Sequence, residues 1–142
     1  MELTAVVVLL GIAAMMAIGR MAPASLTNLG SHTDARQLAL DLIGAQRRAI
    51  ATGDNHYLQF QVSGGRLLGY TLYRAGASGD VAVDNFRPFV VGLTVQGSHT
   101  RAEFNFEGSA LAAYRFTLAA PNRTWQVTVI PVTGAVRVIE LF

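Results

Sequence analysis

The feature that most constrains this chain is an uncharged apolar run near its N-terminus, residues Leu3 to Ile18. Thr4 is the only clearly polar residue within it. As an α-helix the run would span roughly 24 Å, whereas the hydrocarbon core of a bilayer is about 30 Å thick. Gly19 and Arg20 follow the run, and Pro23 disfavours a straight continuation of the helix. The run therefore predicts an apolar helix slightly short for a transmembrane segment.

Three interpretations of this segment are open, and Glu2 separates them. A secretory signal peptide would use the small residues Ala22-Pro23-Ala24 as a cleavage site, but it favours positive charge ahead of the apolar run. A plain transmembrane anchor explains the run, with Glu2 resting among the headgroups near the positive end of the helix dipole. In the third interpretation Glu2 has a partner inside an assembly, because an unpaired carboxylate is costly in an apolar environment.

The stretch from Met1 to Ala14, MELTAVVVLLGIAA, resembles the N-terminus of type IV pilins and type II secretion pseudopilins. In that class a Glu precedes a helix rich in Ala, Val, Leu and Ile with an internal Gly, and Glu2 and Gly11 match these positions. The leader, the cleavage-site Gly and the first mature residues of the pattern are missing. We therefore expect that the natural start lies upstream of Met1 or that the chain is trimmed.

A second helical segment is predicted between Gly30 and Gly53, with Ser31, Thr33 and Asp34 as N-cap candidates. One helical stripe in it consists of small and apolar residues, namely Ala35, Leu38, Ala39, Leu42, Ala45 and Ala49, with Ile43 and Ile50 beside it. Arg47 and Arg48 lie off the stripe and are interpreted as a solvated face. The pattern predicts an amphipathic helix of about five turns that packs closely on a sheet.

Beyond residue 54 the hydrophobic period changes from that of a helix to that of a strand. Ser63-Gly64-Gly65 predicts a hairpin turn, and Pro121-Asn122-Arg123 and Gly134 predict two further turns. The expected strands are marked by Leu58-Phe60-Val62, Leu68-Tyr70-Leu72, Phe89–Val95, Phe104-Phe106, Tyr114-Phe116-Leu118, Trp125-Val127-Val129 and Val136-Val138. Strands that follow a helix, rather than alternate with helices, predict an α+β domain with one or two antiparallel sheets.

The predicted organisation is a transmembrane or filament-core helix over residues 1–22, a linker and amphipathic helix over 23–54, and an antiparallel β-domain over 55–142. Residues 23–142 would form one globular domain.

Several motifs, in this order, resemble the GspH/FimT family of type II secretion minor pseudopilins and type IV minor pilins. They are Ala35-Arg36-Gln37-Leu38, Ala45-Gln46-Arg47-Arg48-Ala49-Ile50, Phe104-Asn105-Phe106-Glu107-Gly108, Trp125-Gln126-Val127-Thr128-Val129 and Gly134-Ala135-Val136-Arg137-Val138. Gln46 stands where the family commonly has Arg. The resemblance covers nearly the whole chain and implies a pilin-like fold, with one long N-terminal helix packed on antiparallel sheets.

Composition and motifs point away from catalysis. The chain has no cysteine, and its 11 basic residues against 9 acidic ones leave a net charge of only +2. His32, His56 and His99 are expected to be isolated surface histidines rather than metal ligands. Glu103 and Glu107 are expected to share an exposed strand face rather than a cleft. We therefore predict no catalytic, cofactor-binding or metal-binding residues, no small-molecule substrate and no enzymatic activity.

The resemblance implies a structural subunit that assembles with other pseudopilins or pilins through its N-terminal helix. Glu2 and Gly11 would be assembly residues, with Glu2 meeting the N-terminal amine of a neighbouring subunit. Before assembly the subunit would lie in a bacterial inner membrane, spanning it once, with its C-terminal domain in the periplasm. N-terminal methylation is also implied.

Two alternative functions remain. The chain could be a FimT-like minor pilin that binds DNA for uptake, with Arg115, Arg123 and Arg137 making weak phosphate contacts. It could also be a secreted soluble β-domain released by cleavage at Ala24.

Overall fold

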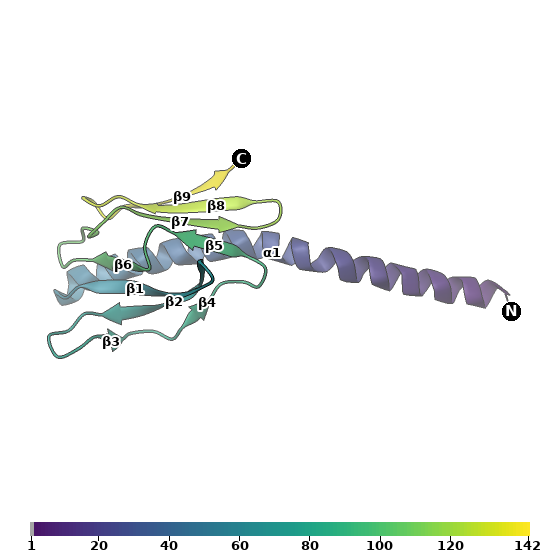
Figure 1. Ribbon diagram of the computed structural model, residues 1–142, viewed down its shortest axis with the longest axis horizontal. Helices are drawn as coiled ribbons and strands as arrows, with labels where there is room; N and C mark the ends of the chain where they lie inside the picture. The colour runs from purple at the N-terminus through teal and green to yellow at the C-terminus, as the bar shows by residue number, and fades with distance from the viewer. Residues whose placement is uncertain (1) are drawn as a thin grey trace.

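The computed structural model describes the backbone of residues 2–142 and the side chains of residues 2–15 and 24–142. Over this range one α-helix, α1 (Glu2–Thr52), leads into nine β-strands arranged in two antiparallel sheets. The C-terminal half of α1 lies against the sheets, and its N-terminal half projects away from them (Figure 1). The predicted fold class, an α+β protein with a long N-terminal helix packed on antiparallel sheets, is confirmed.

Among residues 2–142 the first sheet has five strands in the order β3-β2-β1-β6, with β4 also paired to β2. These strands are β1 (His56–Ser63), β2 (Arg66–Arg74), β3 (Val81–Ala82), β4 (Arg87–Pro88) and β6 (Arg101–Phe104). The second sheet has the order β5-β7-β8-β9, and its strands are β5 (Thr94–Gly97), β7 (Tyr114–Ala119), β8 (Thr124–Val129) and β9 (Val136–Leu141). The predicted hairpin turns at Gly64-Gly65 and Pro121–Arg123 connect β1 to β2 and β7 to β8.

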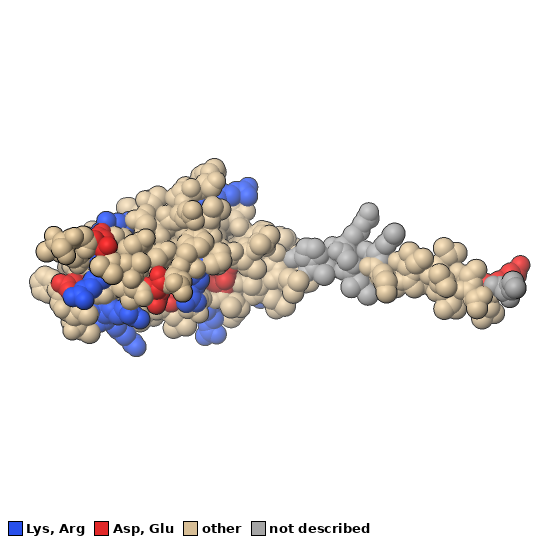
Figure 2. All heavy atoms as spheres, turned by 90° about the horizontal axis from the view of Figure 1, so that it is seen from below, with Lys and Arg blue, Asp and Glu red and all other residues tan. Residues whose placement is uncertain are grey.

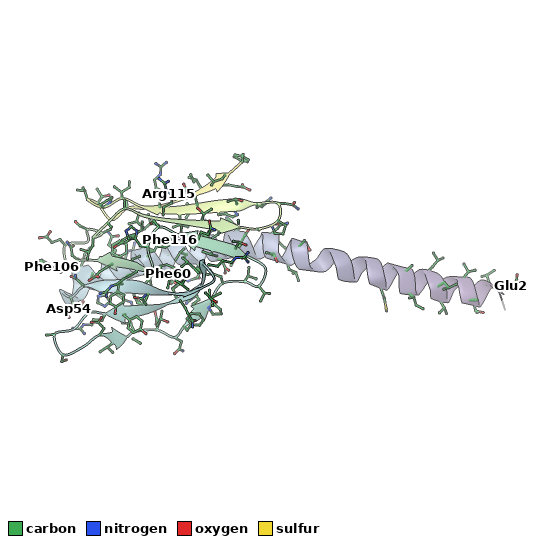
Figure 3. The ribbon with its side chains drawn as sticks, in the orientation of Figure 1. Glu2, Asp54, Phe60, Phe106, Arg115 and Phe116 are labelled. Carbon is green, nitrogen blue, oxygen red and sulfur yellow. The ribbon has the colours of Figure 1, made fainter. Side chains whose placement is uncertain are left out.

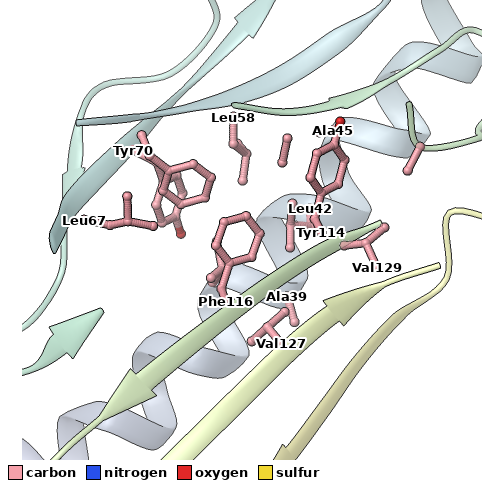
Figure 4. Packing of buried hydrophobic residues seen from close by; sticks show 14 of the residues in the cluster. Ala39, Leu42, Ala45, Leu58, Leu67, Tyr70, Tyr114, Phe116, Val127 and Val129 are labelled. Carbon is pink, nitrogen blue, oxygen red and sulfur yellow. The ribbon is translucent and has the colours of Figure 1, made fainter. Parts of the chain in front are cut away.

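The core forms where the small-residue stripe of α1 meets both sheets (Figure 4). All six predicted stripe residues are buried, and their small size lets the strands approach the helix closely. The rings of Phe60 on β1 and Phe116 on β7 lie 4.6 Å apart between centroids, so aromatic packing joins the two sheets. Arg47 and Arg48 are exposed, as predicted.

The predicted break between two helices is wrong, because α1 runs through Pro23 to Thr52 without interruption. The expected N-cap residues have other partners. Ser31 is buried and its hydroxyl donates to the Asn28 carbonyl at 2.7 Å, while the Asp34 carboxylate accepts a hydrogen bond from the Val90 amide at 2.6 Å. Tertiary contacts from Thr27 onward therefore fix this part of the helix and override the local preference for a cap.

The predicted continuous strand over Phe89–Val95 is also wrong, because β5 begins only at Thr94. Val91 lies in a turn and is 91% exposed. The preceding backbone is bound by the helix instead of by a strand, since Thr27 Oγ1 donates to the Val91 carbonyl at 3.1 Å and Asp34 accepts from Val90. The apolar run thus belongs to a loop that is held against α1.

Two strand alternations depart from the predicted pattern. A β-bulge shifts the register of β1 and β2 between Gln61 and Val62, so that Leu67 is buried and Leu68 is exposed. The strand through Phe104 ends there, because Asn105 Oδ1 accepts hydrogen bonds from the amides of Glu107 and Ser109 and turns the chain. Phe106 is therefore exposed rather than buried beside Phe104.

Gln46 fastens α1 to two turns of the β-domain. Its Nε2 donates to the Gly108 carbonyl at 2.8 Å and to the Thr133 carbonyl at 3.0 Å. Gly134 lies so close that a Cβ there would stand 2.4 Å from Gln46 Nε2 and 2.2 Å from the Gly108 carbonyl oxygen. One amide therefore positions the turn before β9 and the turn after β6 against the helix.

We predict that Gln46→Ala lowers the free energy of unfolding by about 1–2 kcal/mol, because two backbone carbonyls lose their donor. Urea unfolding followed by circular dichroism measures the change. Arg47→Ala, on the exposed neighbouring position, is the matched control and should change stability by less than about 0.5 kcal/mol. Equal effects of the two substitutions would contradict the fastening role of Gln46.

A second prediction concerns Asp34. Burial raises the pKa of its carboxyl group above the usual range, although the hydrogen bond from Val90 opposes this rise. Since the folded state binds the proton more tightly than the unfolded state, the contribution of Asp34 to stability is greatest at acid pH and is lost as pH rises through the folded pKa. Asp34→Asn keeps an acceptor for Val90 without the charge.

The free energy of unfolding of Asp34→Asn should therefore increase relative to that of wild type as the pH is raised from about 3 to 7, so that the variant becomes relatively more stable. Urea titrations at several pH values provide the comparison, with the exposed Asp84→Asn as control. A difference that moves in the opposite direction would show that the ionised carboxylate stabilises the fold.

Candidate assembly surface on the N-terminal helix

The first part of α1, residues 2–15, exposes apolar side chains on every side. Leu3 is 82% exposed, and Val6, Val7, Val8, Leu9 and Leu10 are each more than half exposed. Five consecutive residues turn through more than a full helical revolution, so no single face of this segment is covered by the rest of the chain. In Figure 2 the charged side chains gather over the β-domain, and the described part of the projecting helix is uncharged up to its tip. An apolar surface of this extent marks an interaction site.

The two sequence-predicted assembly residues lie on this segment. Glu2 is in the first turn of α1, at the tip of the helix and remote from the β-domain (Figure 3). Gly11 is exposed, and a Cβ built there would meet no atom within 4 Å in the described part of the chain. The chain's own packing therefore gives no reason for a glycine at this position.

No helix in the part of the chain that the structure describes combines the length and apolar character needed to cross a membrane.

The histidines do not lie together, and one expectation about them is wrong. His56, the first residue of β1, is only 2% exposed, and its Nδ1 lies 2.9 Å from the Asp54 carbonyl oxygen. The ring of His32 lies 4.6 Å from that of Trp125 in a tilted arrangement, and the rings of His99 and Tyr114 meet edge to face. Among the described residues no group of three or more His, Asp or Glu side chains could hold a metal ion.

The expected exposed face shared by Glu103 and Glu107 is also not formed. Glu103 lies on β6 with its side chain only 14% exposed, paired with Arg101 at 2.9 Å and accepting a hydrogen bond from Asn55 at 3.0 Å. Glu107 is exposed in the following turn. The guanidinium of Arg101 also lies 3.6 Å from the ring centre of Tyr57. Burial raises the pKa of Tyr57 to about 12, so this hydroxyl remains protonated in its bond to Asp80.

The structure brings two of the three candidate arginines together. Arg115 on β7 pairs in register with Thr128 on β8, and Thr128 pairs with Arg137 on β9, so both arginines lie in one row on the same face of the second sheet. Both are exposed. Arg123 precedes β8 at the opposite end of that strand, where it lies 3.8 Å from Glu140. The three therefore do not form one patch.

A groove between α1 and the second sheet was not predicted from the sequence. It has a volume of about 520 Å³ and is lined by His32, Arg36, Ala39, Leu40, Trp125 and Val138. His32, Arg36 and Leu40 follow each other at intervals of four residues, which places them along one side of a helix. The sequence shows this spacing, but it does not show which strand residues lie opposite the helix.

No family model matches the chain, and no curated protein matches it in sequence. Among solved structures it is similar to the minor pseudopilin EpsH from the type 2 secretion system of Vibrio cholerae, with 17% identity and a TM-score of 0.64 over 77% of this chain and 95% of that one. It is also similar to the type IV minor pilin FimU of Pseudomonas aeruginosa PAO1, with 15% identity and a TM-score of 0.63 over 76% of this chain and 87% of that one.

These likenesses define the class of fold. The protein has a pilin-like fold, in which a long N-terminal helix packs on antiparallel sheets. More particularly, it has the GspH/FimT-like fold of minor pseudopilins and minor pilins, which the sequence motifs had indicated.

Proposed function

We propose that the chain is a structural minor subunit of a type II secretion pseudopilus or a type IV pilus-like filament, and not an enzyme. The observation that carries the proposal is the projecting half of α1, which is apolar on all sides and attached to a domain with a minor pseudopilin fold. Helices of this kind from several subunits would bury their apolar surfaces against one another. The β-domain would then face outward.

Before assembly, the same helix half would rest in the bacterial inner membrane, with the β-domain on the periplasmic side. The absence of charge between Leu3 and Ile18 supports this placement. Division of the chain into a filament segment up to residue 22 and a globular part after it remains a prediction.

Glu2 and Gly11 would act at the contacts between helices. A carboxylate in an apolar filament core is costly unless a cation or donor satisfies it, and the N-terminal amine of a neighbouring subunit would serve as that partner for Glu2. Gly11 would let a neighbouring helix approach closely, as small residues do between apolar helices. Its empty surroundings within one chain support this role.

The row formed by Arg115 and Arg137 favours DNA binding as a second candidate function. Two exposed arginines in one row of a sheet face, on β7 and β9, could contact phosphates of one duplex. Arg123 would not join them, since it is paired with Glu140. Two phosphate contacts and a net charge of +2 provide little electrostatic attraction, so we propose at most weak, salt-sensitive binding.

The assembly role of Glu2 is tested by Glu2→Leu in a chain that carries a pilin leader. The substitution should leave membrane insertion intact or improve it, because it removes a charge from the apolar segment. It should reduce crosslinking to partner pilin-like subunits by at least about tenfold, because several kcal/mol of pairing energy are lost.

Thr4→Leu, two residues further along the same helix, is the matched control for a general change in helix polarity. Undiminished crosslinking of Glu2→Leu at equal expression would mean that Glu2 merely rests at the headgroups. Loss of membrane insertion in the variant would also contradict the proposed role.

For DNA, we predict that the detergent-solubilised chain binds a duplex poorly at about 150 mM salt, with a dissociation constant weaker than about 100 μM. Fluorescence anisotropy with a labelled duplex at several salt concentrations measures it. Low-micromolar binding that is lost in Arg137→Ala, but kept in Arg66→Ala on the other sheet, would establish DNA binding as the function of the second sheet.

A further inference from the structure

β9 leaves one edge of the second sheet open. Within the described chain β9 pairs with β8 alone and is the last strand of its sheet. Its sequence, VRVIEL, contains no proline, and its pairing with β8 contains no bulge. Natural proteins usually block such an edge with one of these devices or with several charges, because it can pair with another chain. The edge of β9 is therefore available for an additional strand.

The groove described above lies beside this edge. Val138 of β9 and Trp125 of β8 form its sheet side, and Arg36, Ala39 and Leu40 form its helix side. Leu40 is 61% exposed although it belongs to the half of α1 that packs on the sheets. A strand added about 4.8 Å beyond β9 would cover the groove and place every second side chain over Leu40.

Arginines lie on both faces of this edge. Arg36 lines the groove, and Arg137 is exposed on the opposite face of β9. Glu140, the acidic residue of β9, pairs with Trp125 on the groove face, and its carboxylate lies 3.8 Å from Arg123. An incoming segment with carboxylates would therefore meet unbalanced positive charge on both sides of the strand.

We propose that β9 and this groove receive an acidic, extended segment of another protein, which pairs with β9 as a fifth strand of the second sheet. Backbone hydrogen bonds to β9 would supply affinity, and the alternating side chains would determine the specificity for the segment's sequence. Apolar side chains on the segment would pack on Leu40, and its carboxylates, which alternate onto the opposite face, would reach Arg137.

A second copy of this chain fits the edge less well. It would bring the same arginines to the same groove, and the carboxylate that its β9 could offer is paired with Arg123. The proposed contact also uses no residue of the projecting helix half. It is thus independent of the role proposed for Glu2, and either can fail alone.

The probe is a synthetic heptapeptide of alternating valine and glutamate, added to the full chain in detergent micelles. Amide hydrogen exchange in β9 is read by mass spectrometry or NMR. At ten times its dissociation constant, the peptide should slow exchange of the β9 amides that are not bonded to β8 by about tenfold, because they exchange only from the free fraction. Arg137→Gln should weaken binding about threefold, and the distant Arg66→Gln should leave it unchanged.

A control peptide with lysine in place of glutamate should give no protection. Equal protection by the two peptides would refute the charge selection, and no protection by the acidic peptide would refute the proposal as a whole. Protection that grows with protein concentration in the absence of peptide would show that a second copy occupies the edge, which also overturns the proposal.

Discussion

The contact on which the rest of the structure depends is the packing of the small-residue stripe of α1 against two sheets at once. Alanine at four of its six positions lets the strands come close, and Leu38 and Leu42 fill the space that remains. Phe60 and Phe116 then meet across the junction between the sheets. Because the helix serves as the common support, polar side chains of α1 also determine the loops. Thr27 and Asp34 hold the segment before β5, and Gln46 holds the turns after β6 and before β9.

This arrangement divides one helix into two parts with opposite requirements. The C-terminal part buries its apolar residues inside the domain, whereas the apolar residues between Leu3 and Met15 in the N-terminal part are exposed. A rigid connection between the two would transmit the position of the β-domain directly to a filament core. The proposed roles follow from this division, with assembly along the projecting half and partner recognition at the open edge of β9.

The sequence predicted the regular parts of the fold well and the irregular parts poorly. Periodicity alone located the α1 stripe and the buried residues of β7, because each depends on a repeating pattern within one element. It failed over Phe89–Val95, at Leu68 and at Phe106, where hydrogen bonds from distant side chains, a register shift or a local Asn turn decide the backbone. It also failed for His56, which is buried at the start of β1.

For function, the sequence by itself determined the uncharged run from Leu3 to Ile18, the position of Glu2 and Gly11, and the order of motifs that indicates a minor pseudopilin fold. These are local properties of consecutive residues. Only the tertiary structure decided that Arg115 and Arg137 share a row while Arg123 lies apart, since strand register sets which side chains become neighbours. It also decided that His32 and Arg36 border a groove with Trp125 and Val138, because residues about a hundred positions apart meet only when the second sheet folds back onto the helix.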